Sequence, residues 1–236
     1  MQYFGFDRPS FAFKTYGFGA NPDAAILALF TGGKQGVWYD PSDKSTLFQD
    51  VAGTVPVTKD GDPVALMKDK SGNGYHATQS VSTARPLYKT DGVLSWFDTD
   101  GVDDWFKTNY TPSSDWSSSI AMAIIATATA FVFESFSGAA NNYVADGSVV
   151  VVAAPSAEYR QPQDFALDTP FVYSARVQQD NVGTVPLAIS ARYNGTSPSY
   201  HTNNKVYGLI VTNFVMSAEQ IGSVDMYLAK KSGVTL

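Results

Sequence analysis

The chain has 236 residues, of which 44% are hydrophobic and 16% are charged, a balance typical of one folded domain rather than of a disordered chain. Its formal net charge of -6 argues against nucleic acid or a membrane surface as a partner, because both attract clusters of Lys and Arg. Cysteine is absent, which excludes disulfides and cysteine-based zinc sites, and no apolar run approaches the roughly 20 residues that a membrane span needs.

Residues 1–20 alternate aromatic residues with small or polar ones, the pattern of an extended segment with one apolar face. Two interpretations remain open for this segment. It can form an edge strand on the chain's own core, or it can be a docking arm that adds a strand to another subunit. The arm would make its contacts through the aromatic side chains Tyr3, Phe4, Phe6, Phe11 and Phe13.

A short helix is predicted directly after this segment. Asn21 is a suitable N-cap, Pro22 suits the first helical position, and the glycines at 32 and 33 supply a left-handed end. The apolar face of the helix would pack on a sheet. We therefore divide the chain into an extension of residues 1–35, which holds the docking arm and the short helix, and a lectin-like β-sandwich domain of residues 36–236.

The remainder of the chain has the pattern of an all-β protein. A strand at 37–39, a helical turn that ends near Phe48 and a hairpin turn at 59–62 come first. After residue 116, runs rich in β-branched and aromatic residues alternate with turn signals such as Asn194-Gly195, as in a sandwich or barrel. The chain ends in an amphipathic helix, with a capping box formed by Ser217 and Gln220 and a stop at Gly233.

Two glycine-rich acidic turns and short aromatic strands lie between Asp69 and Phe106, and they hold most of the unusual local chemistry. The chain lacks the G-x-S-x-G pentapeptide of hydrolases and the H-E-x-x-H zinc motif. The Gly72-x-Gly74 pair has neither the strand before it nor the helix after it that a dinucleotide site needs. Glutamate occurs only at positions 134, 158 and 219, without a partner carboxylate at strand spacing. We therefore expect a protein that is not an enzyme.

The remaining acidic candidates are Asp98, Asp100, Asp103 and Asp104. In a turn, such residues ordinarily accept hydrogen bonds from their own backbone. They could instead supply oxygen ligands to Ca²⁺, joined by Asp69 and Asn73 if the two acidic turns meet. They are also the carboxylates that a glycosidase would have to use.

The segments DKSGNGYHA and FDTDGVDDWF contain these two turns, and they resemble laminin-G-like or concanavalin A-like jelly-roll domains of bacterial and phage surface proteins. The segments GVWYDPSDKSTLFQD, ARPLY and VYGLIVTN, with the C-terminal AEQIGSVDMYLAKKSG, look more narrowly like tail, tail-fibre or structural proteins of tailed phages. The resemblance covers about residues 36–110 and 205–234. The chain departs from the usual motif by Thr99 within F-D-G and by Trp105 after the acidic pair.

This resemblance implies an all-β fold, a two-sheet antiparallel jelly-roll sandwich with a short N-terminal helix and a C-terminal amphipathic helix. In such domains the acidic turn can bind Ca²⁺, and the matching positions here are Asp100, Asp103 and Asp104. The turns or the concave face can hold sugar. Ligand contacts are expected first at Tyr75, His76 and Trp105, beside the acidic residues.

The setting that the resemblance implies is a virion. We expect a structural phage protein, a tail-fibre, tail-tip or head-decoration subunit that acts in assembly or in adhesion to host-surface carbohydrate. Its partners would be other virion proteins, a host-surface glycan and further copies of itself, most often as a trimer in such appendages. It would require no cofactor, with Ca²⁺ as a candidate, and would be assembled in the bacterial cytoplasm. A polysaccharide-degrading glycosidase and an architectural protein without ligand stay open as alternatives.

Overall fold

The computed structural model describes residues 21–112, 115–125, 133–134, 141–145, 149–153, 158–160, 166–178 and 185–236. The proposed docking arm lies outside these ranges, and its role stays a prediction. Its aromatic residues are Tyr3, Phe4, Phe6, Phe11 and Phe13.

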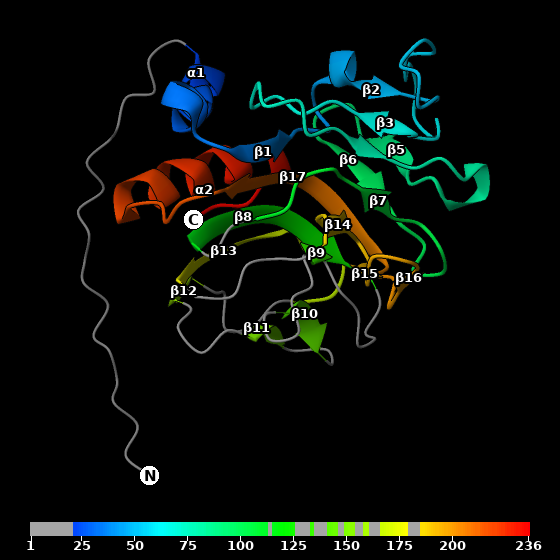
Figure 1. Cartoon of the computed structure of the whole chain (residues 1–236). Helices are drawn as coiled ribbons and strands as arrows, with labels where there is room; N and C mark the ends of the chain where they lie inside the picture. The colour runs from blue at the N-terminus through cyan, green and yellow to red at the C-terminus, as the bar shows by residue number, and fades with distance from the viewer. Residues whose placement is uncertain are drawn as a thin grey trace.

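Two antiparallel sheets make up the body of the protein (Figure 1). The first sheet has the order β12 (Glu158–Arg160), β13 (Phe171–Gln178), β8 (Asp115–Ile124), β17 (Asn204–Thr212), β6 (Ser95–Asp98) and β5 (Leu87–Thr90), with β1 (Gly36–Tyr39) paired to the end of β17. The second has the order β2 (Leu47–Phe48), β3 (Leu66–Met67), β4 (Ala77–Thr78), β7 (Phe106–Lys107), β14 (Ala188–Ile189) and β9 (Phe133–Glu134). Two hairpins pair β10 (Asn141–Ala145) with β11 (Val149–Ala153), and β15 (Arg192–Tyr193) with β16 (Pro198–Ser199). The predicted all-β, two-sheet antiparallel sandwich is confirmed.

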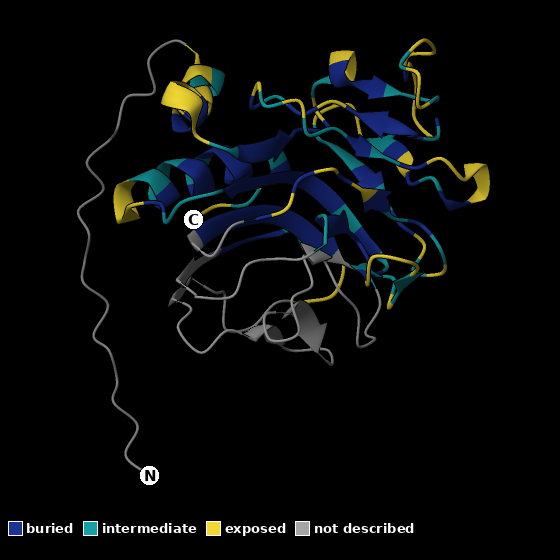
Figure 2. Cartoon of the chain, in the orientation of Figure 1, coloured by how far each residue is buried: buried dark blue, intermediate teal, exposed yellow. Residues whose placement is uncertain are grey.

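The core is divided into two layers. Side chains on a strand alternate between the two faces of its sheet, and one set, which includes Tyr39, Phe97 and Phe106, fills the space between the sheets. The other set, which includes Trp38 and Ile210, lies on the outer face of the first sheet and packs against helices. In Figure 2 the described strands of both sheets are mostly buried, and the exposed residues lie mostly in turns and on the surfaces of the helices.

The helices cover the outer face of the first sheet. They are α1 (Pro22–Leu27), which continues as the 3-10 segment η1 (Ala28–Gly33), and α2 (Ala218–Ser232). The predicted caps are confirmed: the Asn21 side chain accepts from Asp23 N–H, Ser217 and Gln220 form the capping box, and Gly233 is left-handed. Within the described ranges, no helix is both long and apolar enough to cross a membrane.

Two local predictions are corrected by the structure. Leu47 and Phe48 form strand β2 instead of ending a helical turn, because the helical segment there is only η2 (Lys44–Thr46). The apolar pieces beside the turn at 59–62 do not pair with each other: Val57 N–H donates to Leu47 O, and Val64 N–H donates to Pro86 O. A third 3-10 segment, η3 (Ser82–Ala84), precedes β5.

A buried polar group fixes α2 to the sheet beneath it. The hydroxyls of Ser119 on β8 and Ser174 on β13 lie 2.6 Å apart, and Ser174 donates to the carboxylate of Asp225 on α2. Beside this group, Met216 N–H donates to the hydroxyl of Ser117 at 2.9 Å. Since unpaired polar groups are costly to bury, these contacts fix the position of α2 on a surface that is otherwise apolar.

The loop from Asp69 to His76 is fastened to β1 by the Asp69 carboxylate. One of its oxygens accepts from the N–H groups of Trp38 and Ser71, both at 2.9 Å. The other accepts from the Ser71 hydroxyl at 2.7 Å and from Tyr75 N–H at 3.2 Å. The Asp69 side chain thereby satisfies the N–H of Trp38 on the edge of β1 that no described strand covers, and it acts in place of a neighbouring strand.

Other contacts of the same loop strengthen this connection. Lys70 N–H donates to Trp38 O at 2.8 Å, which completes the pairing at that residue of β1. The Asn73 side-chain amide donates to Gly36 O at 3.0 Å. The S-G-N-G motif therefore serves the fold, because its polar groups are directed at β1 rather than at the solvent.

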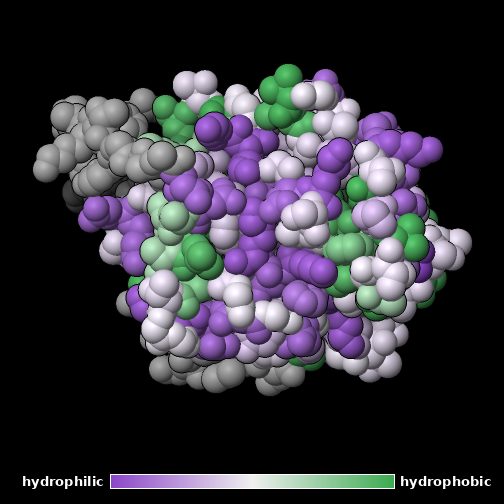
Figure 3. Space-filling view, turned by 90° about the horizontal axis from the view of Figure 1, so that it is seen from above, coloured by the Kyte–Doolittle hydropathy of each residue, from purple (hydrophilic) through white to green (hydrophobic). Residues whose placement is uncertain are grey.

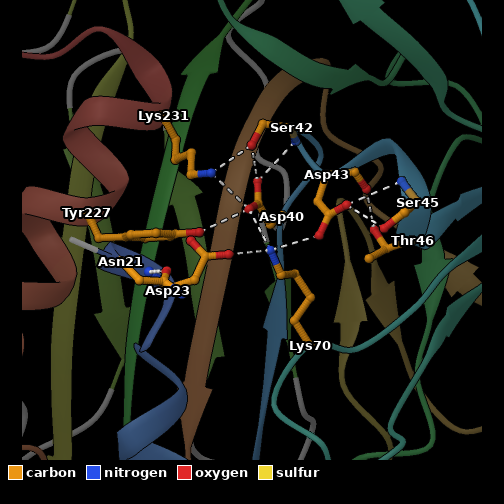
Figure 4. A network of polar contacts seen from close by, with 10 residues as sticks. All are labelled: Asn21, Asp23, Asp40, Ser42, Asp43, Ser45, Thr46, Lys70, Tyr227 and Lys231. Carbon is orange, nitrogen blue, oxygen red and sulfur yellow. Dashed lines mark hydrogen bonds and ion pairs between the residues drawn. The ribbon is translucent and has the colours of Figure 1, made fainter. Parts of the chain in front are cut away.

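A second buried carboxylate, Asp40, connects this loop to the helices (Figure 4). Its Oδ2 accepts from Tyr227 hydroxyl at 2.9 Å and from the Nζ atoms of Lys231 at 3.0 Å and Lys70 at 3.2 Å. Its Oδ1 accepts from the hydroxyl of Ser42 at 2.6 Å. Asp40 is only 1% exposed, so its charge depends on these partners.

Lys70 is the central cation of this network. Its Nζ also lies 2.8 Å from the Asp23 carboxylate, 3.0 Å from that of Asp43 and 4.5 Å from the centre of the Trp38 ring. Burial lowers the pKa of Lys70, but hydrogen bonds and charges from the surrounding carboxylates outweigh it and raise this pKa above its usual range. Asp23 belongs to α1 and Lys70 to the loop, so the network holds α1, the loop and α2 together.

The face that carries α1 and the β2 region is seen from above in Figure 3. Hydrophilic side chains run across its middle, and apolar side chains form separate groups around them. Exposed apolar residues of α1 and of the loop after β2 include Leu27 at 46%, Val51 at 44% and Val55 at 47%. Such scattered exposure is ordinary for a folded protein.

The Asp40 network predicts how stability depends on pH. Burial raises the pKa of Asp40, but Lys231, Ser42 and Lys70 outweigh it and hold the pKa below its usual range. A lowered pKa in the folded state contributes stability that is present above the unfolded-state value of about 3.9 and is lost as the pH falls through the folded-state value. Asp40→Asn should lower the free energy of unfolding at neutral pH by about 3 kcal/mol and flatten its decline in acid, as measured by urea unfolding.

Asp60→Asn is the matched control, because Asp60 is exposed: its carboxylate accepts from Thr90 N–H at 2.9 Å and forms an ion pair with Lys89 at 3.5 Å. The Asp60→Asn substitution should lower the free energy of unfolding by about 1 kcal/mol or less. Equal losses for the two variants would contradict the role given to Asp40.

Candidate functional site

The acidic turn between β6 and β7 gathers negative charge. One carboxylate oxygen from each of Asp100, Asp103 and Asp104 lies within 4.8 Å of the other two. Asp104 is 7% exposed, whereas Asp100 is exposed and Asp103 is half-buried. Asp100 accepts from Val102 N–H at 2.8 Å, as expected of an aspartate in a turn. Among the described residues, no cation forms an ion pair with these three carboxylates.

Thr99 anchors this turn to the start of β17. Its hydroxyl oxygen lies 2.5 Å from Thr202 O and 2.7 Å from Asn204 Oδ1, and it accepts from Asn204 N–H at 3.1 Å. Gly101 has a φ of +76°, and a Cβ there would lie 3.0 Å from the Cβ of Asn203. The inserted Thr99 is thus a buried anchor, and the glycine lets the turn approach the neighbouring strand closely.

Asp104 titrates unlike an ordinary aspartate. Burial raises the pKa of this carboxyl, and the charges of Asp100, Asp103 and Asp98 raise it further, to about 6, although Asp100 N–H acts in the opposite direction. Beside it, Nδ1 of His201 lies 3.4 Å from Asp104 O. At mildly acidic pH, the turn can therefore present a carboxylic acid next to carboxylates, which is the arrangement that general acid chemistry requires.

Trp105 follows the turn and stacks on Tyr193 of β15. The ring centroids lie 5.3 Å apart, with 25° between the planes. Lys107 Nζ lies 4.7 Å from the centre of the Tyr193 ring and 3.1 Å from its hydroxyl, which in turn donates to Gly195 O at 2.8 Å. Because Phe106 points into the core, Trp105 and Lys107 lie on the outer face of the second sheet. The half-buried indole is therefore held in place while part of it reaches the surface.

Strained backbone flanks the β15–β16 hairpin on both sides. Ser190 has a φ of 64° and Tyr200 a φ of 52°, and such values are uncommon outside glycine and concentrate at functional sites. The Ser190 hydroxyl donates to Asn204 Oδ1 at 3.1 Å, whereas Tyr200 is 52% exposed. The strained residues Ser190 and Tyr200 were not predicted as site residues, because only the Asn194-Gly195 turn signals the hairpin in the sequence.

The other two predicted ligand residues lie elsewhere. Tyr75 packs beside Tyr110, with ring centroids 5.2 Å apart, and the antiparallel pairing of β4 with β7 places this pair toward the opposite end of β7 from Trp105. His76 Nδ1 accepts from Asp69 N–H at 3.1 Å. The structure therefore does not bring Tyr75 and His76 together with Trp105, and it employs both in the loop that holds β1.

The acidic turn has the spacing of a calcium site. Ca²⁺ contacts oxygens at about 2.3 to 2.6 Å, so two oxygens on one ion can be separated by up to about 5 Å. The carboxylate oxygens of Asp100, Asp103 and Asp104 lie within 4.8 Å of one another and satisfy this condition. Asp69 and Asn73 do not join them, because their side chains bond to β1 and to their own loop. Calcium would have to take its remaining oxygens from the backbone or from water.

Comparison with known proteins gives few matches. No protein-family model matches the chain, and no curated protein sequence matches it. Among solved structures, Trypanosoma rangeli sialidase is 9% identical with a TM-score of 0.41, and the match covers 83% of this chain and 37% of the sialidase. The same enzyme in complex with 2,3-difluoro-KDN is 7% identical with a TM-score of 0.40, and the match covers 77% of this chain and 34% of that one. The chain thus spans about a third of the length of these sialidases.

This comparison corrects one expectation from the sequence. We expected a protein that is not an enzyme, whereas the similar solved structures are sialidases, which are glycosidases. That exclusion is therefore withdrawn. Because the identities are 7 to 9% and the TM-scores are below 0.5, no residue role is transferred from these enzymes to this chain.

The pKa of Asp104 predicts a pH-dependent effect on stability. A carboxyl whose pKa is about 6 when folded, against about 3.9 when unfolded, makes the folded state less stable as the pH rises between these values. Asp104→Asn should therefore raise the free energy of unfolding by about 1 to 2 kcal/mol at about pH 8 and change it little at about pH 4. Chemical denaturation at the two pH values measures the difference.

Asp91→Asn is a control of opposite sign. Hydrogen bonds from the N–H groups of Leu94 and Val93 hold the pKa of Asp91 below its usual range, so this substitution should destabilise the protein at the higher pH. If Asp104→Asn raised the free energy of unfolding equally at both pH values, the raised pKa of Asp104 would be contradicted.

Proposed function

We propose that this chain is a carbohydrate-binding β-sandwich domain whose ligand site is the acidic turn together with the β15–β16 hairpin. The observation that carries the proposal is the fixed Trp105 ring beside carboxylates that no described cation neutralises. A sugar ring presents C–H groups on one face and hydroxyls at its edge. An indole can stack on the C–H face, and carboxylates can accept from the hydroxyls.

The charge of the site favours neutral sugars or amino sugars over acidic ones. Asp100, Asp103 and Asp104 would repel a sugar carboxylate, and Lys107, which lies on the same face of the second sheet as Trp105, is already engaged with Tyr193. A Ca²⁺ ion held by the three carboxylates would remove this repulsion and offer open coordination positions to hydroxyl groups. Binding measured with and without Ca²⁺ therefore separates the two modes of recognition.

The binding proposal is tested with Trp105→Ala. A glycan array identifies the sugars that the wild-type chain binds, and calorimetric titration with the best of them measures affinity. Loss of the stacked ring should weaken binding about tenfold or more. Trp96→Ala is the matched control, because Trp96 is also half-buried and packs against an aromatic ring, Tyr207, at 5.6 Å on a different face.

Two results would overturn this proposal. One is a wild-type protein that binds no glycan on the array. The other is equal binding by the Trp105→Ala and Trp96→Ala variants, which would place any sugar site away from Trp105.

A second candidate function, glycosidase activity, is favoured by the raised pKa of Asp104. Retaining glycosidases hold an acid and a nucleophilic carboxylate about 5 Å apart, and inverting ones about 6.5 to 9.5 Å. Oxygens of the three aspartates lie within 4.8 Å of one another, nearer to the retaining arrangement. Asp104 would protonate the glycosidic oxygen, and Asp103 or Asp100 would attack the anomeric carbon to form an ester that water then hydrolyses.

Hydrolysis is tested by the release of reducing ends from the glycans that the chain binds. The rate should fall as the pH rises above about 6, because the acid must be protonated, and Asp104→Asn should lower it about a hundredfold or more. Asp91→Asn should leave the rate unchanged. Glycan binding without any release of reducing ends would leave recognition as the function and overturn the enzymatic candidate.

We propose further that the domain is displayed on a phage particle, in assembly or in adhesion to host-surface glycan. Support for this setting comes from sequence resemblance alone, chiefly that of GVWYDPSDKSTLFQD, ARPLY and VYGLIVTN, with the C-terminal AEQIGSVDMYLAKKSG, to tailed-phage proteins. The virion partners, the homo-oligomer and the docking arm belong to the same proposal. Mass spectrometry of purified particles would detect the chain if the setting is right, and its consistent absence from them would overturn it.

A further inference from the structure

The sequence contains two Asn-Gly pairs, Asn73-Gly74 and Asn194-Gly195. An asparagine reacts most readily with the backbone nitrogen of the next residue when that residue is glycine, because glycine has no side chain to hinder the attack. That nitrogen can attack the side-chain carbonyl carbon of the asparagine. The two pairs share this local chemistry and differ in their surroundings, so the structure decides which of them reacts.

Asn194 lies exposed in the turn of the β15–β16 hairpin. Its Oδ1 accepts from Thr196 N–H at 2.9 Å and from Ser197 N–H at 2.8 Å. These two donors polarise the side-chain carbonyl and are placed to stabilise the negative charge that develops on Oδ1 during an attack on Cγ. Among the described contacts, the Asn194 amide nitrogen has no acceptor, so nothing there holds the leaving group.

Asn73 is held in the opposite way. Its amide nitrogen donates to Gly36 O at 3.0 Å and to Lys34 O at 3.3 Å, and the residue is half-buried in the loop that clasps β1. Attack on its carbonyl carbon would have to turn the amide plane and break both contacts. No donor to its side-chain oxygen is present among the described residues. Asn73 is therefore protected by the same hydrogen bonds that fasten the loop.

We infer that Asn194 is a site of spontaneous deamidation and isoaspartate formation in the folded chain, whereas Asn73 is not. The Gly195 nitrogen forms a bond to Cγ of Asn194 and loses its proton, and the C–N bond of the side-chain amide breaks to release ammonia. Water then opens the resulting succinimide at either carbonyl, giving aspartate or isoaspartate. The sum of the steps is one water consumed and one ammonia released, with no oxidant or reductant.

The reaction changes the hairpin that supports Trp105. It adds one negative charge, and the isoaspartate product also lengthens the backbone of the turn by one carbon. Gly195 O accepts from the Tyr193 hydroxyl at 2.8 Å, so a displaced turn would loosen the ring on which Trp105 stacks. Deamidation at Asn194 needs no ligand, so the inference does not rest on the proposed carbohydrate binding.

The test is to incubate the full folded chain at mildly alkaline pH and to map its peptides by mass spectrometry over time. Deamidation raises the mass of a peptide by about one dalton, and isoaspartate changes its retention. The peptide that contains Asn194 should convert about tenfold faster, or more, than the one that contains Asn73, because two hydrogen bonds must break at the latter. In denaturant the two peptides should convert at similar rates.

The control variant is Asn194→Gln, in which the corresponding ring would have six members and form far more slowly. Its side chain is exposed and bonds only within its own turn among the described contacts, so the variant should fold and should lose the fast conversion. Faster conversion at Asn73 in the folded chain would overturn the inference. So would conversion at both sites in denaturant with none at Asn194 in the folded protein.

Discussion

The carboxylate of Asp69 is the interaction on which the rest of this fold depends. Among the described strands, β1 pairs only with β17, and on its other side the Asp69 side chain accepts from Trp38 N–H. The same carboxylate organises its own loop through Ser71 and Tyr75. Since unpaired backbone donors are costly to bury, the loop and the strand fold as one unit, and the S-G-N-G motif is a structural signature of the sandwich.

The position of this loop fixes that of the helices. Lys70 follows Asp69 directly and is carried by the loop into the space between α1 and α2, where it meets Asp23 and the buried Asp40. At the junction of β1, the loop and the helices, the carboxylates are therefore neutralised by a nearby ammonium group. At the acidic turn, by contrast, Asp104 lies among like charges, and its pKa is raised to about 6. The uncompensated group is the better candidate for ligand chemistry.

The sequence predicts features that depend on near neighbours and misses those that depend on the fold. The capping box at Ser217 and the clustering of Asp100, Asp103 and Asp104 follow from spacings of a few residues, so both are visible in the chain. The contact of Asp40 with Tyr227 joins residues 187 positions apart, and no local pattern marks it. The stacking of Trp105 on Tyr193 is equally non-local. Tyr75 and His76 lie in the loop that holds β1, away from Trp105, and their part in ligand binding stays a prediction.

Hydrogen exchange at the amides of Trp38 and Tyr75 tests the central role of Asp69 most directly. In an Asp69→Asn variant, the amide oxygen replaces only part of the acceptor set. Protection of these two amides should therefore fall about tenfold to a hundredfold. Amides in the β8–β17 pairing should retain most of theirs. Unchanged protection at Trp38 and Tyr75 would contradict the account, because β1 would then be held by something other than this carboxylate.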